Sequence, residues 1–432
     1  MSKELYRQSV LLPWLKQSVD PMVVKEARGV YLTLDDGSVV LDMKSQAFCA
    51  NLGHGHQGMQ QAMVAAASKT GVFSSEIYCE ERLKLAHSLK RIAPRNDDIT
   101  LTKVFYTLGG AEANENAIKM ARMFTGRHKI ITRYRSYHGA TLATMNMSGD
   151  YRRIPVDNAI TGVIRFPDPY PRGSGQVIDT VRLLEEIIEI EGPETIAAVM
   201  LEGITGANGV FVPPPDYWPR IRKLCSTHGI MLIADEVLSG FFRTGTWFGV
   251  DHFNVAPDMI TMSKGLTAGY APLGAVMIRK EVADYFENEV LWCGLTQYGH
   301  SFACATAQAA IGFYESERIG DNVKARGAEL AEMLSALKRS QPLVAEVRSL
   351  GLLAAIDLRK GAHDDSPLVP YRAVGDALKP AQQLVVLLKK AGVSAMVRFG
   401  TIIIAPPLTI NQAELKEGMA GIAQALENLK SS

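Results

Sequence analysis

Two charged side chains stand at the ends of apolar stretches, where a soluble protein rarely places a charge. Lys264 ends the stretch "DMITMSKG" (258–265), and a glycine-rich run, "GLTAGYAPLGA", overlaps its end. Asp235 stands near the end of "GIMLIADEV" (229–237). An unpaired charge in such surroundings is costly. A lysine in a dry pocket loses its proton more readily than one in water, and the neutral amine forms Schiff bases with aldehydes.

Other residues that could bind a ligand follow three further apolar stretches. "KVFYT" (103–107) runs into "LGGAEANENA", whose glycines stand just before a helical pattern. The amides and dipole of such a helix start can hold a phosphate. "KIITRY" (129–134) precedes Tyr137 and His138, and an aromatic ring such as Tyr137 can stack on a flat ligand. "TIAAVMLEG" (195–203) carries Glu202 near its end.

These features together fit one cofactor. A lysine for an aldehyde, an aspartate for a protonated ring nitrogen, a phosphate site and a stacking ring match pyridoxal 5'-phosphate. Each feature alone is ordinary, because most glycine pairs are only turns and most strand-terminal acids are caps or ion pairs. Their order on successive stretches favours the cofactor. The turn is not GxGxxG, so a nicotinamide dehydrogenase is a distant alternative.

The stretches themselves have the length and composition of buried strands. The predicted strands cover 103–107, 129–134, 195–203, 229–237 and 258–265, and helical patterns between them cover 178–191 and 216–228. Alternation of strand and helix predicts an α/β fold with a mostly parallel sheet flanked by helices. Ligands of such sheets bind beyond the carboxyl ends of the strands, where all the residues above would meet.

The composition of the chain narrows the classes of partner and the location that we expect. The chain has 432 residues with 47% apolar and 21% charged residues and a formal charge of +1. That balance favours neither nucleic acid nor an anionic membrane as a partner. No apolar run approaches the ~18 residues of a membrane span, and the N-terminus lacks the apolar core of a signal peptide. Five scattered cysteines form no pair at metal spacing, so we expect no metal, and they suggest a cytoplasmic location.

Several motifs resemble those of the class III aminotransferases, pyridoxal-phosphate enzymes of fold type I that include the ω-amino acid transaminases. The similarity covers nearly the full chain and rests on "YTLGGAEANENAIKMAR", "YRSYHGAT", "LIADEVLSGFFRTGTWFG", "PDMITMSKGLTAGYAPLGAV", "GLTQYGHSFACATA" and "IIIAPPLTI". The resemblance implies Lys264 as the Schiff-base lysine and Asp235 as the partner of the ring nitrogen. It implies cofactor contacts from Gly110, Ala111, Tyr137, His138, Glu202 and Val237. Thr296 matches a threonine that reaches the phosphate of the partner subunit, which implies a homodimer with shared active sites, with a tetramer as the alternative.

Within that family, "SQAFCANLGHGH" (45–56) and "SGDYRR" (148–153) look most like the taurine and ω-amino acid aminotransferases. Ala207 stands where ornithine- and 4-aminobutyrate-type enzymes have a glutamate that pairs with a substrate-binding arginine. Met396 stands near the usual position of that arginine, with Arg398 closer to Pro406. Arg398 and the pair Arg152–Arg153 are therefore alternative anchors for a substrate anion.

Trp14 and Phe48 resemble pocket walls of relatives, although ordinary packing would also explain them. The resemblance implies a large cofactor domain over residues 58–305 and a smaller α+β domain from 1–57 and 306–432. In the smaller domain we expect a helix near 318–340 and strands near 344–358 and 401–405.

The implied activity transfers an amino group from a taurine- or β-alanine-type donor to pyruvate or 2-oxoglutarate, by a ping-pong mechanism. A racemase or aminomutase of the same fold shares Lys264 and Asp235, so the sequence separates it poorly. A non-catalytic protein that binds the cofactor is a further alternative, which retention of both residues disfavours.

Overall fold

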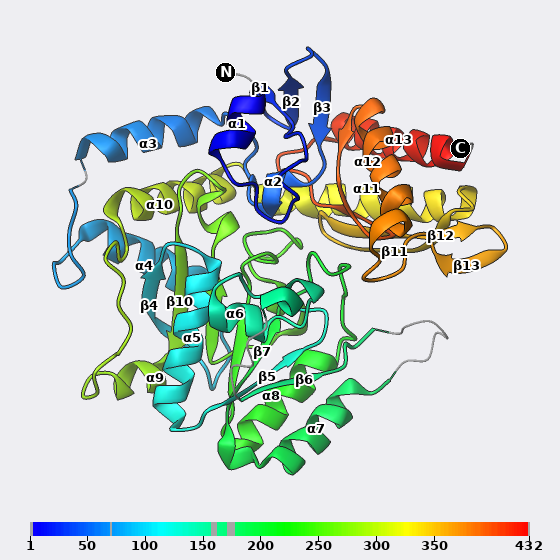
Figure 1. Cartoon of the computed structure of the whole chain (residues 1–432). Coiled ribbons are helices and arrows are strands. Elements are labelled where there is room, and N and C mark those ends of the chain that lie inside the picture. The colour runs from blue at the N-terminus through cyan, green and yellow to red at the C-terminus, as the bar shows by residue number, and fades with distance from the viewer. Residues whose placement is uncertain (1–2, 70, 157–161, 171–177, 431–432) are drawn as a thin grey trace.

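One sheet forms the centre of the larger part of the molecule (Figure 1). The structure is a computed structural model that describes residues 3–69, 71–156, 162–170 and 178–430. Within these residues seven strands form this sheet in the order β4-β10-β9-β8-β7-β5-β6. Their bounds are β4 Leu101–Thr107, β5 Lys129–Arg133, β6 Val163–Phe166, β7 Ile196–Glu202, β8 Met231–Asp235, β9 Met259–Met262 and β10 Gly274–Arg279.

The direction of the strands brings the polar residues to one edge of the sheet. β5, β6, β7, β8 and β9 run parallel, and β10 lies antiparallel to both β9 and β4. Because β10 is reversed between them, β4 points the same way as β9. The carboxyl ends of β4, β5, β7, β8 and β9 therefore share one edge, as the sequence predicts.

Helices cover both faces of this sheet. α5 (Gly110–Thr125) packs on one face through Ala113, Ala117 and Ala121, against alternate strand residues such as Met200 and Ile233. The intervening strand residues face α4, α7 and α8 on the other side. The remaining helices of the larger part are α3 Gln57–Lys69, α4 Glu80–Ile92, α6 Leu142–Met147, α7 Thr180–Glu191, α8 Tyr217–His228, α9 Lys280–Tyr285 and α10 Ser301–Ser316.

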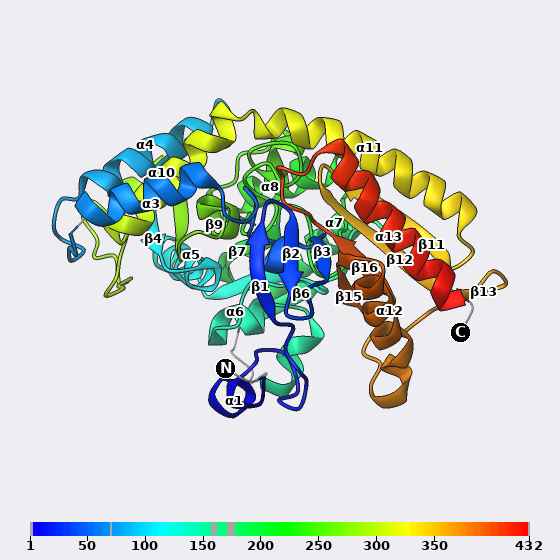
Figure 2. The same ribbon diagram turned by 90° about the horizontal axis from the view of Figure 1, so that it is seen from above.

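The smaller part contains elements from both ends of the chain. One sheet has the order β1-β2-β3-β14, in which the C-terminal strand β14 (Val393–Ser394) pairs in parallel with β3. A second, antiparallel sheet has the order β11-β12-β16-β15, with β13 paired to β12, and Figure 2 shows α11 and α13 beside it. The bounds are α1 Lys3–Ser9, β1 Val24–Arg28, β2 Tyr31–Leu34, β3 Val39–Asp42, α2 Ser45–Phe48, α11 Ile319–Ser340, β11 Val344–Leu350, β12 Leu353–Gly361, β13 Asp364–Pro367, α12 Lys379–Lys390, β15 Met396–Arg398, β16 Thr401–Ile404 and α13 Gln412–Lys430.

The α/β class, the mostly parallel sheet and the smaller α+β part are confirmed. The stretch 344–358 is not one strand, because Gly351 has a φ of +59° and turns the chain between β11 and β12. Strand β9 ends at Met262, so Lys264 lies in the turn beyond it rather than in a strand. The domain boundaries at 57/58 and 305/306 stay predictions. No helix in the described ranges is both long and apolar enough to cross a bilayer.

Candidate active site

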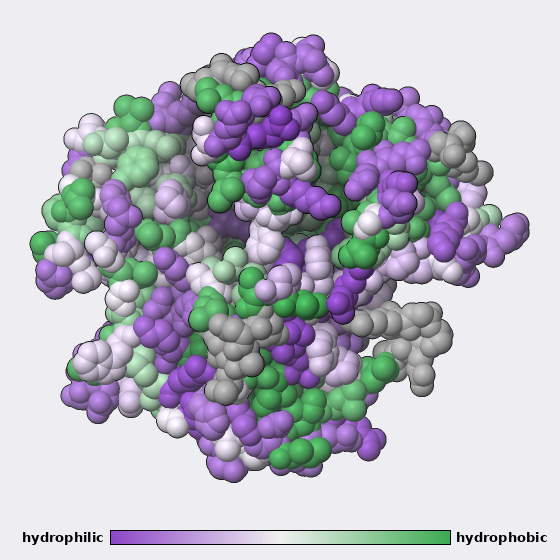
Figure 3. Space-filling model, in the orientation of Figure 1, coloured by the Kyte–Doolittle hydropathy of each residue, from purple (hydrophilic) through white to green (hydrophobic). Residues whose placement is uncertain are grey.

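A chamber of 460 Å³ opens at the carboxyl edge of the central sheet. Its walls come from both parts of the molecule, and Figure 3 shows a recess between the upper and lower halves of this face. The lining residues include most of those singled out in the sequence: Trp14, Phe48, Gly110, Ala111, Tyr137, His138, Glu202, Asp235, Val237, Lys264 and Arg398. Segments far apart in the chain thus meet in one concave site, which is typical of a small-molecule pocket.

Lys264 opens a short 3₁₀ turn directly after β9 and Ser263. Its backbone has a φ of +40°, in the left-handed region that side-chain-bearing residues seldom adopt. Such strain clusters at functional sites. Burial lowers the pKa of the Lys264 ammonium, while the negative charges of Asp235 and Glu202 oppose that shift. The geometry therefore offers an amine that gives up its proton more easily than a surface lysine.

Asp235 is buried at the end of β8 and is held by three donors. Its Oδ2 accepts from Asn114 Nδ2 and lies 2.8 Å from His138 Nδ1, and its Oδ1 accepts from the Val237 amide. Asn114 in turn accepts at Oδ1 from the Thr261 hydroxyl at 2.6 Å. These contacts fix the carboxylate in one orientation, as an ion pair with a protonated ring nitrogen requires.

Glu202 and Tyr137 lie beside this carboxylate. Glu202 ends β7, accepts the amides of Tyr137 and Gly206, and is only 6% exposed. Burial raises the pKa of Glu202 above its ordinary value. The Arg152 guanidinium carbon lies 3.7 Å from the centre of the Tyr137 ring, so one face of that ring is already covered by a cation. Glu202 thus supports the turn that carries the aromatic side chain.

The start of α5 provides a place for a phosphate. α5 begins at Gly110, and no side chain caps its first turn. A Cβ on Gly110 would lie 2.7 Å from a methyl group of Val237, so only glycine fits between the helix start and β8. Uncapped amides at a helix N-terminus bind anions. With the amine of Lys264 and the fixed carboxylate of Asp235, the residues present fit pyridoxal phosphate.

Two arginines meet at one buried aspartate on the other side of the chamber. Asp150 accepts from Arg152 Nη2 at 3.0 Å and forms an ion pair with Arg398. Burial alone would raise the pKa of Asp150, but these two guanidinium groups hold it below its ordinary value. Both arginines line the chamber, whereas Arg153 is not among its described lining residues. Of the pair Arg152–Arg153, the geometry favours Arg152.

Of the other sequence predictions, Phe48 is a buried wall of the chamber, Trp14 lies at its exposed edge, and Thr296 lies outside it. The Phe48 ring lies 5.9 Å from Lys264 Nζ and is 5% exposed. Trp14 packs edge-on to Tyr137 with ring centres 6.4 Å apart and is 56% exposed. Thr296 is exposed and does not line the chamber of its own chain, so its contact with a partner's phosphate stays a prediction.

Sequence reasoning missed Asn114, Thr261 and Asp150. Asn114 has a readable signal, because it is a polar residue beside the apolar spacing of Ala113, Ala117 and Ala121 on a buried helix face. Thr261 carries no such signal, since threonine is common in strands. Asp150 stands two residues before Arg152, but its second partner, Arg398, is 248 residues away. Pairing over that distance follows only from the fold.

Comparisons with known proteins agree with this geometry. A putrescine–pyruvate aminotransferase of Pseudomonas aeruginosa is 30% identical over 414 residues, covering 91% of this chain and 88% of the relative. A taurine–pyruvate aminotransferase of Bilophila wadsworthia is also 30% identical, covering 96% of this chain and 94% of the relative.

Among solved structures, the taurine:2-oxoglutarate aminotransferase of Bifidobacterium kashiwanohense, in complex with pyridoxal phosphate and glutamate, is 36% identical. It superposes with a TM-score of 0.93 over 100% of this chain and 98% of that one. The family model for class-III aminotransferases matches residues 15–426. The chain therefore belongs to the class III aminotransferases, and it is a pyridoxal-phosphate-dependent transaminase of ω-amino acids or amines.

Proposed function

We propose that this transaminase takes its amino group from a donor with a carboxylate or sulfonate, of the taurine or β-alanine type. The observation that supports this most directly is the pair of arginines at Asp150. Two guanidinium groups share one carboxylate there, so the cluster carries a net positive charge beside the Lys264 chamber. Paired N–H donors of an arginine suit either acid. Similarity to the two taurine aminotransferases points the same way.

The polar residues in and around the chamber have distinct roles in this proposal. Bound pyridoxal phosphate supplies an aldehyde for the amino group and a ring that accepts electrons from the substrate carbon. The amine of Lys264 would remove a proton from that carbon as a base and would give the proton back as an acid. Asp235 keeps the ring nitrogen protonated, and Asn114 and His138 keep Asp235 oriented. Arg398 or Arg152 holds the distal anion of the donor.

The second half of the reaction uses the same groups in reverse order, with pyruvate or 2-oxoglutarate as the acceptor. Thr296 acts on the partner's phosphate in a homodimer, and its exposure on a single chain is consistent with that role. A cytoplasmic location is part of the proposal, supported by Cys49, Cys79, Cys225, Cys293 and Cys304, each of which is a free thiol.

A donor-by-acceptor panel tests the proposal. The purified protein with added cofactor is mixed with taurine, β-alanine or propylamine, and with pyruvate or 2-oxoglutarate. We expect alanine or glutamate to form fastest from the two anionic donors. Activity with propylamine but with neither anionic donor would mean that the arginine pair does not bind the donor. Conversion of a donor to its isomer without transfer would indicate a racemase or aminomutase. Absence of the visible absorbance of bound cofactor, even after cofactor is added, would indicate a non-catalytic protein.

A further inference from the structure

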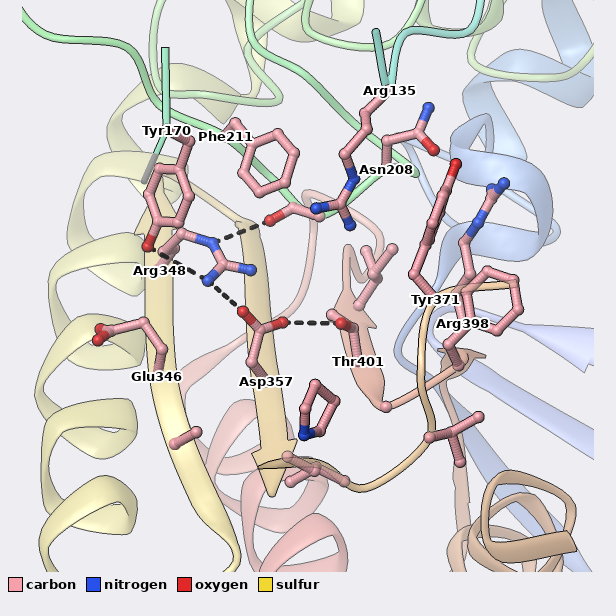
Figure 4. Close-up of a pocket in the computed structure, with 18 of the residues that line it drawn as sticks. Arg135, Tyr170, Asn208, Phe211, Glu346, Arg348, Asp357, Tyr371, Arg398 and Thr401 are labelled. Carbon is pink, nitrogen blue, oxygen red and sulfur yellow. Dashed lines mark hydrogen bonds and ion pairs between the residues drawn. The ribbon is translucent and has the colours of Figure 1, made fainter. Parts of the chain in front are cut away.

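A second chamber of 480 Å³ adjoins the first. It lies between the β11-β12-β16-β15 sheet and the loop that follows β7, and Figure 4 shows the side chains around it. The two chambers share Ala207 and Arg398 as lining residues, so these two residues form the wall between them. The side chain of Ala207 is a single methyl group, so little side-chain volume separates the two chambers at this residue.

Aromatic rings hold the cations of this chamber in place. The guanidinium carbon of Arg135 lies 4.8 Å from the Phe211 ring centre and 5.0 Å from that of Tyr371. The Arg348 guanidinium carbon lies 5.0 Å from the Tyr170 ring centre. Stacked guanidinium groups lose little further freedom when they bind an anion, because their planes are already fixed.

The acids that line this chamber are already paired. Asp357 accepts from Arg348 at 2.6 Å and from the Thr401 hydroxyl at 2.7 Å (Figure 4). Glu346 is bonded to Lys338, and Asp365 to Arg359. These carboxylates are therefore not available to hold a cationic ligand.

Two buried polar groups, by contrast, lack partners. Asn208 is 4% exposed, and neither its Nδ2 nor its Oδ1 has a hydrogen-bond partner among the described residues. Arg348 Nη2 is also buried and without a partner in the described part of the chain. Both residues line the chamber, and Arg348 Nε donates to the carbonyl of Gly209, the next residue in the chain after Asn208. Figure 4 shows the Arg135 guanidinium between the two side chains. Buried polar groups are nearly always satisfied, so two unsatisfied donors in one chamber point to an absent acceptor.

We infer that this chamber is a subsite for the distal carboxylate of a long-chain amino donor, received by Asn208 and Arg348. The donor's amino end lies at Lys264, and its chain passes Ala207 between the two chambers. The inference rests on the proposed function and narrows it. It adds donors with a longer chain to the short anionic donors that Arg398 or Arg152 would hold.

The test uses a series of ω-amino acids with pyruvate, from β-alanine to the six-carbon and eight-carbon homologues. Asn208→Leu removes the side-chain amide with both of its unpaired polar atoms, and Asn208→Asp places a negative charge where the substrate carboxylate would bind. We expect kcat/KM for the longest donor to fall about tenfold or more in both variants, because a hydrogen bond to a charged group is lost. Activity with β-alanine should stay within about twofold.

A matched control is Gln382→Leu, which removes an exposed amide on α12, away from both chambers. A second readout does not depend on turnover: calorimetric titration of the holoenzyme with pimelate, a linear dicarboxylate without an amine. We expect Asn208→Leu to weaken pimelate binding about tenfold or more and Gln382→Leu to leave it unchanged.

The inference is overturned if Asn208→Leu lowers activity equally for short and long donors, or if neither kcat/KM for the longest donor nor pimelate affinity changes. If no donor yields alanine, the proposed function fails, and pimelate binding still decides whether the chamber receives a carboxylate.

Discussion

Two opposing influences act on the ammonium group of Lys264. Burial lowers its pKa, whereas the charges of Asp235 and Glu202 favour the protonated form. An amine whose pKa is lowered by burial gives up its proton more easily than a surface lysine, which helps a group that must act first as a base and then as an acid. Lys264 has a φ in the left-handed region, in the turn that follows strand β9, and its side chain lines the chamber.

Lys264→Ala should therefore abolish turnover and spare part of cofactor binding. We expect alanine formation from taurine or β-alanine to fall by about three orders of magnitude or more, because the amine that we propose as the base at the substrate carbon is removed. The phosphate site at α5 and the carboxylate of Asp235 remain, so cofactor should still co-purify in part. Alanine formation and cofactor content measure the two effects. Full transaminase activity in the variant would end this account of the chemistry.

Arg398→Leu should separate anionic donors from neutral ones. We expect kcat/KM for taurine to fall about tenfold to a hundredfold, since a charge-assisted bond contributes about 1.5–3 kcal/mol. Propylamine, which has no distal anion, should react within about threefold of the unaltered rate. Steady-state kinetics with both donors provides the comparison. An equal loss for both would mean that Arg398 supports the chamber through Asp150 and does not bind substrate.

The residue types in the sequence predict which side chains line the site better than they predict the contacts between those side chains. Lys264, Asp235 and Glu202 could be predicted because a charge after an apolar strand is unusual in any fold. Asp150 could not, because an aspartate two residues from an arginine is ordinary until Arg398 arrives from β15. Arg153 was put forward along with Arg152 because sequence alone does not say which of two neighbours faces inward.

At the scale of elements, the end of β8 separates two neighbouring acids. Asp235 faces the chamber, whereas Glu236 is fully buried and accepts from the Ser239 hydroxyl and the Gly249 and Val250 amides. Gly203 leaves room for it, since a Cβ there would lie 2.2 Å from Glu236 Oε1. Burial raises the pKa of Glu236 to about 7. A group of this kind is a structural acid and lies outside the reaction.

Glu236 should make folding stability depend on pH in a defined direction. Its folded-state pKa is raised from the ordinary 4.5 to about 7, so the folded protein binds that proton more tightly than the unfolded chain does. The resulting stabilisation is complete below about pH 4.5 and is lost as the pH rises through about 7. Relative to Glu236→Gln, the free energy of unfolding should fall by about 3 kcal/mol over that window. Denaturant titrations between about pH 5 and about pH 8 would capture most of the fall.

The control exchange is Glu186→Gln at an exposed position of α7, which replaces a carboxylate by an amide outside the core. If the difference between the unaltered protein and Glu236→Gln stays constant with pH, Glu236 is ionised in the folded state throughout. Its three donors would then outweigh the cost of burial.

The central elements could be predicted because their strands are buried on both faces and read as short apolar runs between turns. β10 was not foreseen, although "GAVMI" has the same composition, because a strand that runs antiparallel inside a parallel sheet has no distinct pattern. The range 344–358, where the sequence predicts strand, holds a hairpin of β11 and β12, because Gly351 with its left-handed φ turns the chain between them.

At the scale of the whole molecule, one buried arginine connects segments that lie far apart in the chain. Arg243 lies in "GFFRTG" and donates to the carbonyls of Leu352 and Pro406 and to Asn51 Oδ1, at 3.1, 2.6 and 3.0 Å. It also donates to the Ser45 hydroxyl at 3.3 Å. Burial lowers the pKa of Arg243 to about 10, which still leaves it charged at neutral pH. The cation thus joins the N-terminal segment, the loop after β8 and the C-terminal part.

Arg243→Met should loosen this junction and reduce activity from a distance. The substitution leaves at least two carbonyls and an amide oxygen buried without a donor, at about 1–3 kcal/mol each, so we expect a loss of about 3 kcal/mol or more. The segment between Ser45 and Asn51 carries Phe48, a wall of the Lys264 chamber, so kcat/KM should fall as well. Denaturant unfolding and steady-state kinetics measure the two effects. Arg243→Lys should restore little of either, because one ammonium group cannot reach all the acceptor oxygens that the planar guanidinium spans. Arg182→Met, at a position on α7 with 75% of its side chain exposed, should change neither. If Arg243→Met lowers stability and leaves kcat/KM intact, the chamber wall is held by the rest of the interface, and the coupling between the junction and the active site is absent.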